Sequence, residues 1–138
     1  MDKEETLEIG TINIKGLRDY KKRQKFRSYA KANILFVQET HWGNRRESSK
    51  WVLQLGYEKA IFTTYGNNAR GTAILIKGWE IEEEINDVEG RFSAGIITKG
   101  NMKLIVMNTY MPNTTPFGDN LEYTRKMRQI KNTLNRLT

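Results

Sequence analysis

The segment that most constrains this chain is a short apolar run that ends beside an acid. Residues 34–37 (Ile-Leu-Phe-Val) are all apolar, with no alternation, which is typical of a central strand buried on both faces of a sheet. Glu39 follows between the polar residues Gln38 and Thr40. Ligands of open α/β sheets bind beyond the carboxyl ends of the strands, so Glu39 is a candidate for chemistry. The simpler alternative is that Glu39 ends the strand and faces water.

Length and composition narrow the class of protein. The 138 residues suffice for one domain or a piece of a larger one. The absence of Cys and the single His exclude disulfides, thiolate nucleophiles and multi-histidine metal centres. The net charge of +7 favours a polyanionic partner, most simply nucleic acid, although many ordinary soluble domains are this basic. Neither a signal peptide nor an apolar run of membrane length is present, so we expect an intracellular protein that is not secreted and has no membrane partner.

The charge is unevenly distributed along the chain. Residues 15–31 contain eight Lys and Arg against one Asp, and residues 120–138 contain five against one Glu, so these segments carry net charges of +7 and +4. Residues 79–89 instead contain six acids. Glu80, Glu82, Glu84 and Asn86 alternate with Trp79, Ile81, Glu83 and Ile85. We therefore interpret the acidic run as the solvated face of a strand near a sheet edge, not as a metal site.

Hydrophobic patterning predicts a mixed α/β fold. A strand over residues 6–14, a helix over 20–31 and the central strand form a βαβ-like start. Residues 102–109 predict another strand, and the continuous apolar run within it predicts burial on both faces. The last helix has no strand after it, so we expect one incomplete domain over residues 1–138. The remaining expected elements are a helix over 47–55, strands over 57–65, 72–77, 79–86 and 91–98, and a helix over 120–137.

Three of the predicted strands end in polar residues. Asn13 closes the first strand, Glu39 the central one, and Asn108 and Tyr110 the last. If these strands lie side by side and parallel, Asn13, Glu39 and Tyr110 meet at one edge of the sheet. Carboxylate and amide oxygens suit Mg²⁺, and a tyrosine hydroxyl can donate to a phosphate oxygen. The alternatives are a turn residue for Asn13 and a loop-packing role for Tyr110, so patterning alone indicates a candidate metal or phosphate site.

The exact strings carry a more specific resemblance. Residues 11–17 with Lys22 and Arg23, then 34–41, 71–76, 87–92 and 108–113, are similar in order and spacing to the endonuclease/exonuclease/phosphatase family. Within it, the chain most resembles the apurinic-type endonuclease domain of LINE-type (non-LTR) retrotransposons. The resemblance covers essentially the whole chain. It implies the N-terminal half of a four-layer α/β sandwich, a mixed β-sheet flanked by helices, truncated before the second sheet.

The resemblance also implies roles for particular residues. Glu39 resembles the family's Mg²⁺ carboxylate, Asn13 the amide on the opposite side of the same site, and Tyr110 the tyrosine at the scissile phosphate; these are the implied catalytic residues. Glu39 and Asn13 are the implied ligands of Mg²⁺, or of Mn²⁺ in its place. Asn113 and Arg91 occupy positions where relatives approach the nucleic-acid backbone.

The implied function is Mg²⁺-dependent hydrolysis of a DNA phosphodiester, as in target nicking by a retrotransposon. A nuclear location follows if the element is eukaryotic, with a downstream reverse transcriptase in the full-length protein. The family's second half supplies a Gly-Asp-Phe-Asn strand end and a Ser-Asp-His string, which this sequence lacks. We therefore expect negligible activity from this chain alone. The alternatives are a fragment of a same-fold phosphomonoesterase or phospholipid phosphodiesterase, and a non-catalytic nucleic-acid-binding module.

Overall fold

The computed structural model describes residues 6–66, 69–116, 118 and 120–138. The strands and helices in this part of the chain follow the predicted order, with ends that shift by one to three residues. They are β1 (Ile9–Asn13), α1 (Tyr20–Tyr29), β2 (Ile34–Gln38), α2 (Arg45–Gln54), β3 (Lys59–Phe62), β4 (Thr72–Ile76), β5 (Glu80–Asn86), β6 (Phe92–Lys99), β7 (Met102–Thr109) and α3 (Leu121–Leu137).

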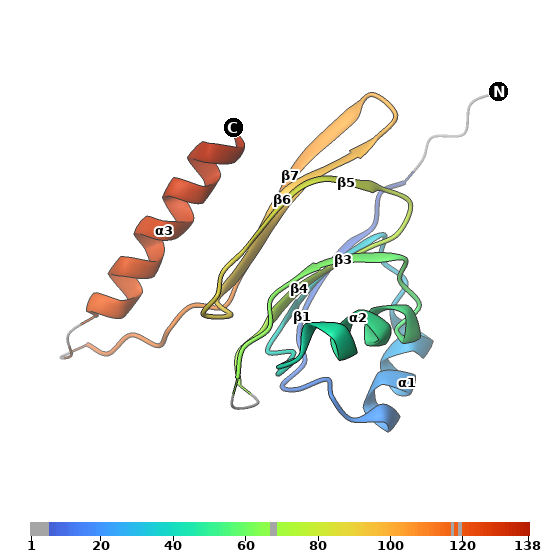
Figure 1. The fold of residues 1–138 in the computed structure, drawn as a ribbon, viewed down its shortest axis with the longest axis horizontal. Helices are drawn as coiled ribbons and strands as arrows, with labels where there is room; N and C mark the ends of the chain where they lie inside the picture. Colours follow the sequence, from blue (N-terminus) through green and yellow to red (C-terminus); the bar gives the residue numbers. More distant parts are fainter. Residues whose placement is uncertain (1–5, 67–68, 117, 119) are drawn as a thin grey trace.

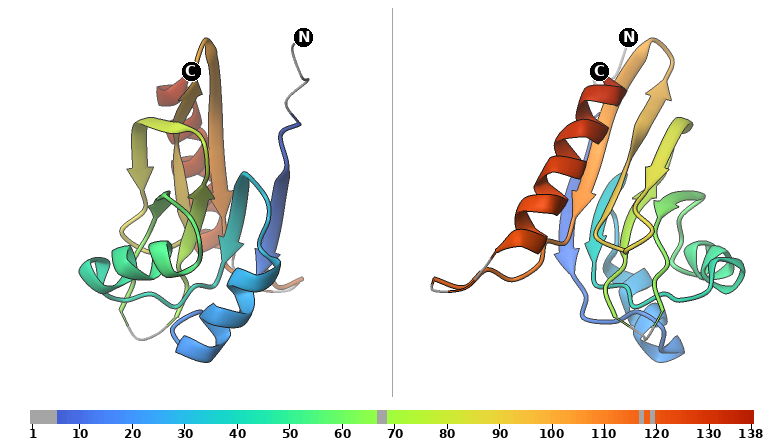
Figure 2. Two further views of the ribbon diagram at one scale, coloured as in Figure 1. Left: turned by 90° about the vertical axis from the view of Figure 1, so that its right-hand side faces the viewer. Right: turned by 60° about the vertical axis from the view of Figure 1, so that its left-hand side comes forward.

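The elements stack in four layers (Figure 1, Figure 2). The first sheet has the strand order β1-β2-β4-β3, with β1 and β2 parallel and the other pairs antiparallel. The second sheet is antiparallel and has the order β5-β6-β7. Helices α1 and α2 pack on the outer face of the first sheet, and α3 packs on the outer face of the second. The predicted α/β class and four-layer sandwich are therefore confirmed.

The expectation that the chain stops before a second sheet is wrong. Strands β6 and β7 form a hairpin that pairs Phe92 with Thr109, and β5 adds to its other side. The inner face of this sheet carries Ile97 and Val106, which pack against the apolar side chains of the first sheet. Hydrophobic patterning located these strands but cannot say which strands pair, so it did not separate the two sheets.

Strand β7 also differs from the prediction that it is buried on both faces. Val106 and Asn108 point to the first sheet and are only 6% and 3% exposed, whereas Ile105 on the other face is 42% exposed. The cause is position: β7 ends the strand order of the second sheet, and α3 lies mainly over β6. In β7, the continuous apolar run therefore belongs to an edge strand of which only the face towards the first sheet is covered.

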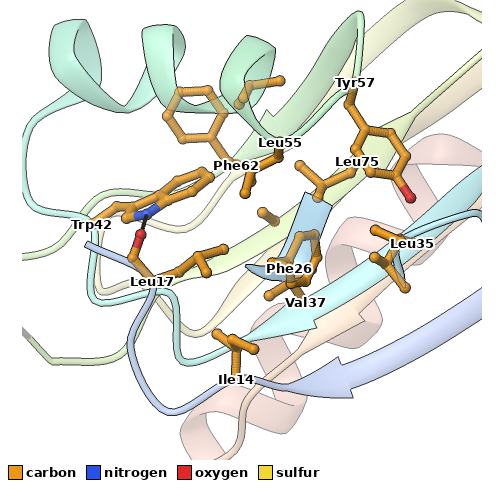
Figure 3. Close-up of a cluster of buried hydrophobic side chains, with 13 residues drawn as sticks. Ile14, Leu17, Phe26, Leu35, Val37, Trp42, Leu55, Tyr57, Phe62 and Leu75 are labelled. Atoms are coloured by element: carbon orange, nitrogen blue, oxygen red, sulfur yellow. Dashed lines mark hydrogen bonds between the residues drawn. The ribbon is translucent and has the colours of Figure 1, made fainter. Parts of the chain in front are cut away.

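The central strand β2 behaves as its sequence predicts. It lies between β1 and β4, and Val37 faces the helices while Ile34 faces the second sheet, both fully buried. Beyond it, the fully buried Trp42 donates its indole N–H to the carbonyl of Leu17 at 3.2 Å and packs edge-on against Phe62 (Figure 3). This side chain joins the segment after β2 to the segment after β1, so it fixes the ends of the two parallel strands.

Helix α3 is attached to the second sheet by ion pairs as well as apolar contacts. The Lys126 ammonium is fully buried and donates to Asp87 at 3.0 Å and Glu89 at 2.6 Å. Arg125 binds both Glu89 carboxylate oxygens, at 2.9 and 3.1 Å. Hydrogen bonds from Arg125 and Lys126 lower the pKa of Glu89 to about 2 from an ordinary 4.5. The helix is therefore held to the turn between β5 and β6.

The predicted apolar stripe of α3 is only partly buried. Ile130 and Leu137 are 7% and 6% exposed, but Met127 and Leu134 are 43% and 37% exposed. The hydrophobic spacing therefore located the helix correctly. The face of α3 that contacts the sheet includes the buried Lys126, so it coincides with only part of the apolar stripe.

Acid should weaken the attachment of α3. Because folding lowers the pKa of Glu89, its contribution to stability is present above pH 4.5 and is lost as the pH falls towards 2. We expect Glu89→Gln to lower the free energy of unfolding at neutral pH and to flatten its decline below pH 4.5, measured by urea unfolding at a series of pH values. The exposed Glu58→Gln is the control. Acid profiles of Glu89→Gln and wild type that coincide would contradict this assignment.

Candidate functional site

Four loops meet at the end of the sandwich where β1 and β2 finish. We call them the rim: residues 14–17 after β1, 39–42 after β2, 69–71 before β4, and 87–91 before β6. Backbone hydrogen bonds link these loops in series. The Gly16 N–H donates to the Glu39 carbonyl at 2.6 Å, and the Thr40 N–H donates to the Gly71 carbonyl at 3.1 Å. The Gly71 N–H in turn donates to the Gly90 carbonyl at 3.1 Å. Because the parallel register sets Asn13 beside Gln38, the first two loops start side by side.

The rim backbone is strained. Glu39, His41 and Arg70 have φ angles of 59°, 60° and 58°, in the left-handed region that residues other than Gly rarely adopt. Gly71 also has a positive φ, and a side chain there would collide with the hydroxyl of Thr40. Such conformations persist only where the surroundings hold them, and they cluster at functional sites. The strain thus marks the rim as a candidate site independently of its side chains.

Glu39 and Tyr110 are in direct contact. The Tyr110 hydroxyl donates to a carboxylate oxygen of Glu39 at 2.5 Å. Tyr110 follows β7 of the second sheet, so it reaches Glu39 across the sandwich and not along one sheet, as side-by-side parallel strands would have required. The hydrogen bond to Glu39, with some burial, raises the pKa of Tyr110 above its usual value, so the phenol keeps its proton at neutral pH.

Asn13 lies at the same end of the molecule, on a groove between β1 and β7. The groove has a volume of about 510 Å³ and is lined by Thr11, Asn13, Phe36, Gln38 and residues 107–111, Tyr110 among them. The Asn13 side chain is exposed and accepts a hydrogen bond from the Lys15 backbone at 3.2 Å. That contact is typical of a turn residue. Asn13 also lines the groove that Tyr110 lines, so the structure is compatible with both interpretations of Asn13.

Arg91 is close to Tyr110, and Asn113 is farther along the chain. Arg91 donates to the Tyr110 carbonyl at 3.3 Å, and its guanidinium lies 5.2 Å from the centre of the Tyr110 ring. Its backbone N–H donates to Asp87 at 3.1 Å, which fixes the turn before β6. Asn113 is exposed in the loop after β7. The structure thus brings Arg91 into contact with Tyr110, and Tyr110 into contact with Glu39.

Asn108 is a site residue to which the sequence assigned no role. Its side-chain amide donates to the carbonyls of Val37 at 2.8 Å and Ala73 at 2.9 Å, and its oxygen accepts from Gln38 at 2.7 Å. Asn108 therefore bridges β7 to β2 and β4. Its partner Gln38 immediately precedes Glu39, and Asn108 itself lies two residues before Tyr110. A lone amide at the end of an otherwise apolar strand was the available signal.

The donor set for a cation is small. In residues 6–66, 69–116, 118 and 120–138, no three His, Cys, Asp or Glu side chains are grouped closely enough to hold a metal ion. The site offers the Glu39 carboxylate and the Asn13 amide.

Among the residues that the structure describes, no helix is both long and apolar enough to span a bilayer.

The chain shares its fold with solved structures of the endonuclease/exonuclease/phosphatase fold. No family model and no curated protein matches the chain. Solved structures do match, among them TDP2 from Caenorhabditis elegans, with a TM-score of 0.60 and 16% identity over 94% of this chain and 42% of that chain. The Xenopus laevis APE2 catalytic domain matches with a TM-score of 0.53 and 16% identity, over 90% of this chain and 50% of that chain. The AP endonuclease LMAP from Leishmania major matches with a TM-score of 0.55 and 19% identity, over 88% of this chain and 43% of that chain. This chain therefore spans half or less of each of these three.

Removing the Asn108 bridge should destabilise the sandwich. We expect Asn108→Ala to lower the free energy of unfolding by about 1–3 kcal/mol, because it leaves the carbonyls of the buried Val37 and Ala73 without the donor that Asn108 supplies. Chemical denaturation followed by fluorescence measures the change. Thr109→Ala, at an exposed position on the same strand, is the matched control. Equal stabilities for the two variants would show that the bridge contributes nothing.

Proposed function

We propose that this chain is the N-terminal portion of a Mg²⁺-dependent endonuclease that hydrolyses a phosphodiester bond in DNA. The observation that carries the proposal is the hydrogen bond between Tyr110 and Glu39 across the sandwich, at the end of a groove that Asn13 also lines. It joins a metal-binding type of side chain to a phosphate-binding type in one place. The fold supports it, since one structural neighbour is an AP endonuclease by name.

The residues present fit a magnesium ion. The Glu39 carboxylate and the Asn13 amide supply hard oxygen donors, and Mg²⁺ usually takes one or two protein carboxylates, several waters and substrate phosphates. Mn²⁺ accepts the same donors. When bound, the ion would offset negative charge on the phosphate.

The side chains have complementary tasks toward a phosphate. Tyr110 keeps its proton at neutral pH because its pKa is raised, so its hydroxyl remains a hydrogen-bond donor. A donor held in place before the reaction can stabilise charge that develops on a phosphate oxygen. Arg91 holds the Tyr110 backbone and adds positive charge beside it. None of these residues is assigned to activating the attacking water, and the loss of such a group costs several powers of ten in rate. We therefore propose that the chain alone is inactive.

The basic helix α1 favours nucleic acid over a small phosphate ester. Helix α1 contains no acid, and none of the ion pairs among the described residues involves its cations. Exposed on it are Lys21, Lys25 and Arg27. The helix begins at Tyr20, soon after the rim loop that follows β1 (Figure 1), so we propose that its charges contact a nucleic-acid backbone bound at the rim.

Finer parts of the proposal rest on the sequence strings alone. These are target nicking for a LINE-type retrotransposon, a nuclear location and a downstream reverse transcriptase. A same-fold phosphomonoesterase or phospholipid phosphodiesterase shares residues like Asn13 and Glu39, so these two residues do not separate it from the nuclease. The basic helices and the string Gln-Glu-Thr-His at residues 38–41 favour nucleic acid.

Duplex DNA binding over a salt series tests the substrate class. Neutralisation of the backbone by several cations makes the affinity fall steeply as salt rises, with a slope of about 0.9 per phosphate contact. We expect such a slope in a filter-binding assay, and no Mg²⁺-dependent nicking of plasmid by the chain alone. A flat salt response would contradict the nucleic-acid assignment. Nicking that Glu39→Gln abolishes would instead contradict the proposed inactivity.

A further inference from the structure

Arg70 belongs to no part of the site that the sequence indicated, yet it lies within the rim. Its guanidinium stacks 4.4 Å above the ring centre of Tyr65 and donates to the Glu89 carbonyl at 3.1 Å. Its own carbonyl accepts a hydrogen bond from the His41 backbone at 2.9 Å. The side chain is 22% exposed, so it is fixed in position and still reaches solvent.

Arg70 and Arg91 lie on segments that are in backbone contact. The Gly71 N–H donates to the Gly90 carbonyl at 3.1 Å, and a Cβ built on Gly90 would lie 3.3 Å from the Cβ of Arg70. The positive charge of Arg70 lowers the pKa of Arg91, after the larger effect of burial. Two guanidinium groups are thus held near each other beside Tyr110.

The positive charge of this pair is weakly compensated. Glu122 is 3.9 Å from Arg70, a long ion pair, and the Glu89 carboxylate is engaged by Arg125 and Lys126 of α3. In addition, the Nε of Arg91 is buried and has no hydrogen-bond partner. A buried donor without a partner costs free energy, so the hydrogen bonds of the Arg91 side chain within the protein are incomplete.

We propose that Arg70 and Arg91 form an anion subsite that binds a phosphate next to the one held at Glu39 and Tyr110. The guanidinium fork matches the oxygen geometry of a phosphate, and a shared anion relieves the repulsion between two like charges. The inference rests on the proposed function and names a further contact of that same site. The competing explanation is that Arg70 only tethers its loop to Tyr65 and Glu89.

Inorganic phosphate tests the subsite without nucleic acid. In ¹H–¹⁵N spectra of the full chain, we expect the Nε–H signals of Arg70 and Arg91 to shift together as phosphate is added, while that of Arg136 on the last turn of α3 stays in place. Arg70→Gln should weaken the phosphate response of Arg91 several-fold. Unmoved arginine signals in the wild type, or an unchanged Arg91 response in a folded Arg70→Gln, would overturn the subsite.

Duplex DNA provides the second test. Arg70→Gln should reduce the salt slope of binding by about 1, whereas Arg70→Lys keeps the charge and should keep the slope. Arg136→Gln, at the end of α3 away from the rim in Figure 1, is the charge-matched control. Equal loss of slope in Arg70→Gln and Arg136→Gln would overturn the subsite. Phosphate binding by both arginines without DNA binding would leave the subsite standing and contradict the proposed function.

Discussion

The site depends on the contact between β7 of one sheet and β2 of the other. Apolar side chains hold the two sheets together, but they do not by themselves fix how far one strand slides along its neighbour. Asn108 does so, because its amide and carbonyl bind groups of β2 and β4 at set distances. Glu39 and Tyr110 follow these two strands directly, so the bridge determines that they meet. A polar residue inside an apolar layer therefore fixes the relative position of the two strands, which the apolar contacts alone do not.

The rim shows how the fold maintains a strained backbone. Glu39, His41 and Arg70 adopt left-handed conformations that each cost free energy. Serial hydrogen bonds between the rim loops, and the buried Trp42 behind them, hold these residues in place. The result is a carboxylate directly after the end of β2 that accepts a hydrogen bond from the Tyr110 hydroxyl. Arg125 and Lys126 of α3 bind acids of the same turn that carries Arg91, so the outermost helix also supports the site.

The sequence predicted the elements and their order well, because period and turn residues are local signals. These local signals predicted the buried apolar run of β2 and the acidic edge strand β5. They also predicted the βαβ-like start, in which β1 and β2 are parallel. The pairing of β5 to β7 into a second sheet did not, since strand partners depend on contacts far apart in sequence. Three site candidates, Glu39, Tyr110 and Arg91, form a chain of contacts, and Asn13 lines the same groove as Tyr110. Asn108 was noted as a polar strand end without a role, and Arg70 and Lys126 were missed, because the importance of all three lies in what they touch.

We propose that Glu39, Asn13 and Tyr110 form one cation and phosphate site. Paramagnetic line broadening by Mn²⁺ is the sharpest test, because the effect depends on distance from the ion. We expect the signals of these three residues to broaden first and Glu39→Gln to abolish the effect. Broadening centred on the acidic strand β5, with the rim signals unchanged, would contradict the proposal.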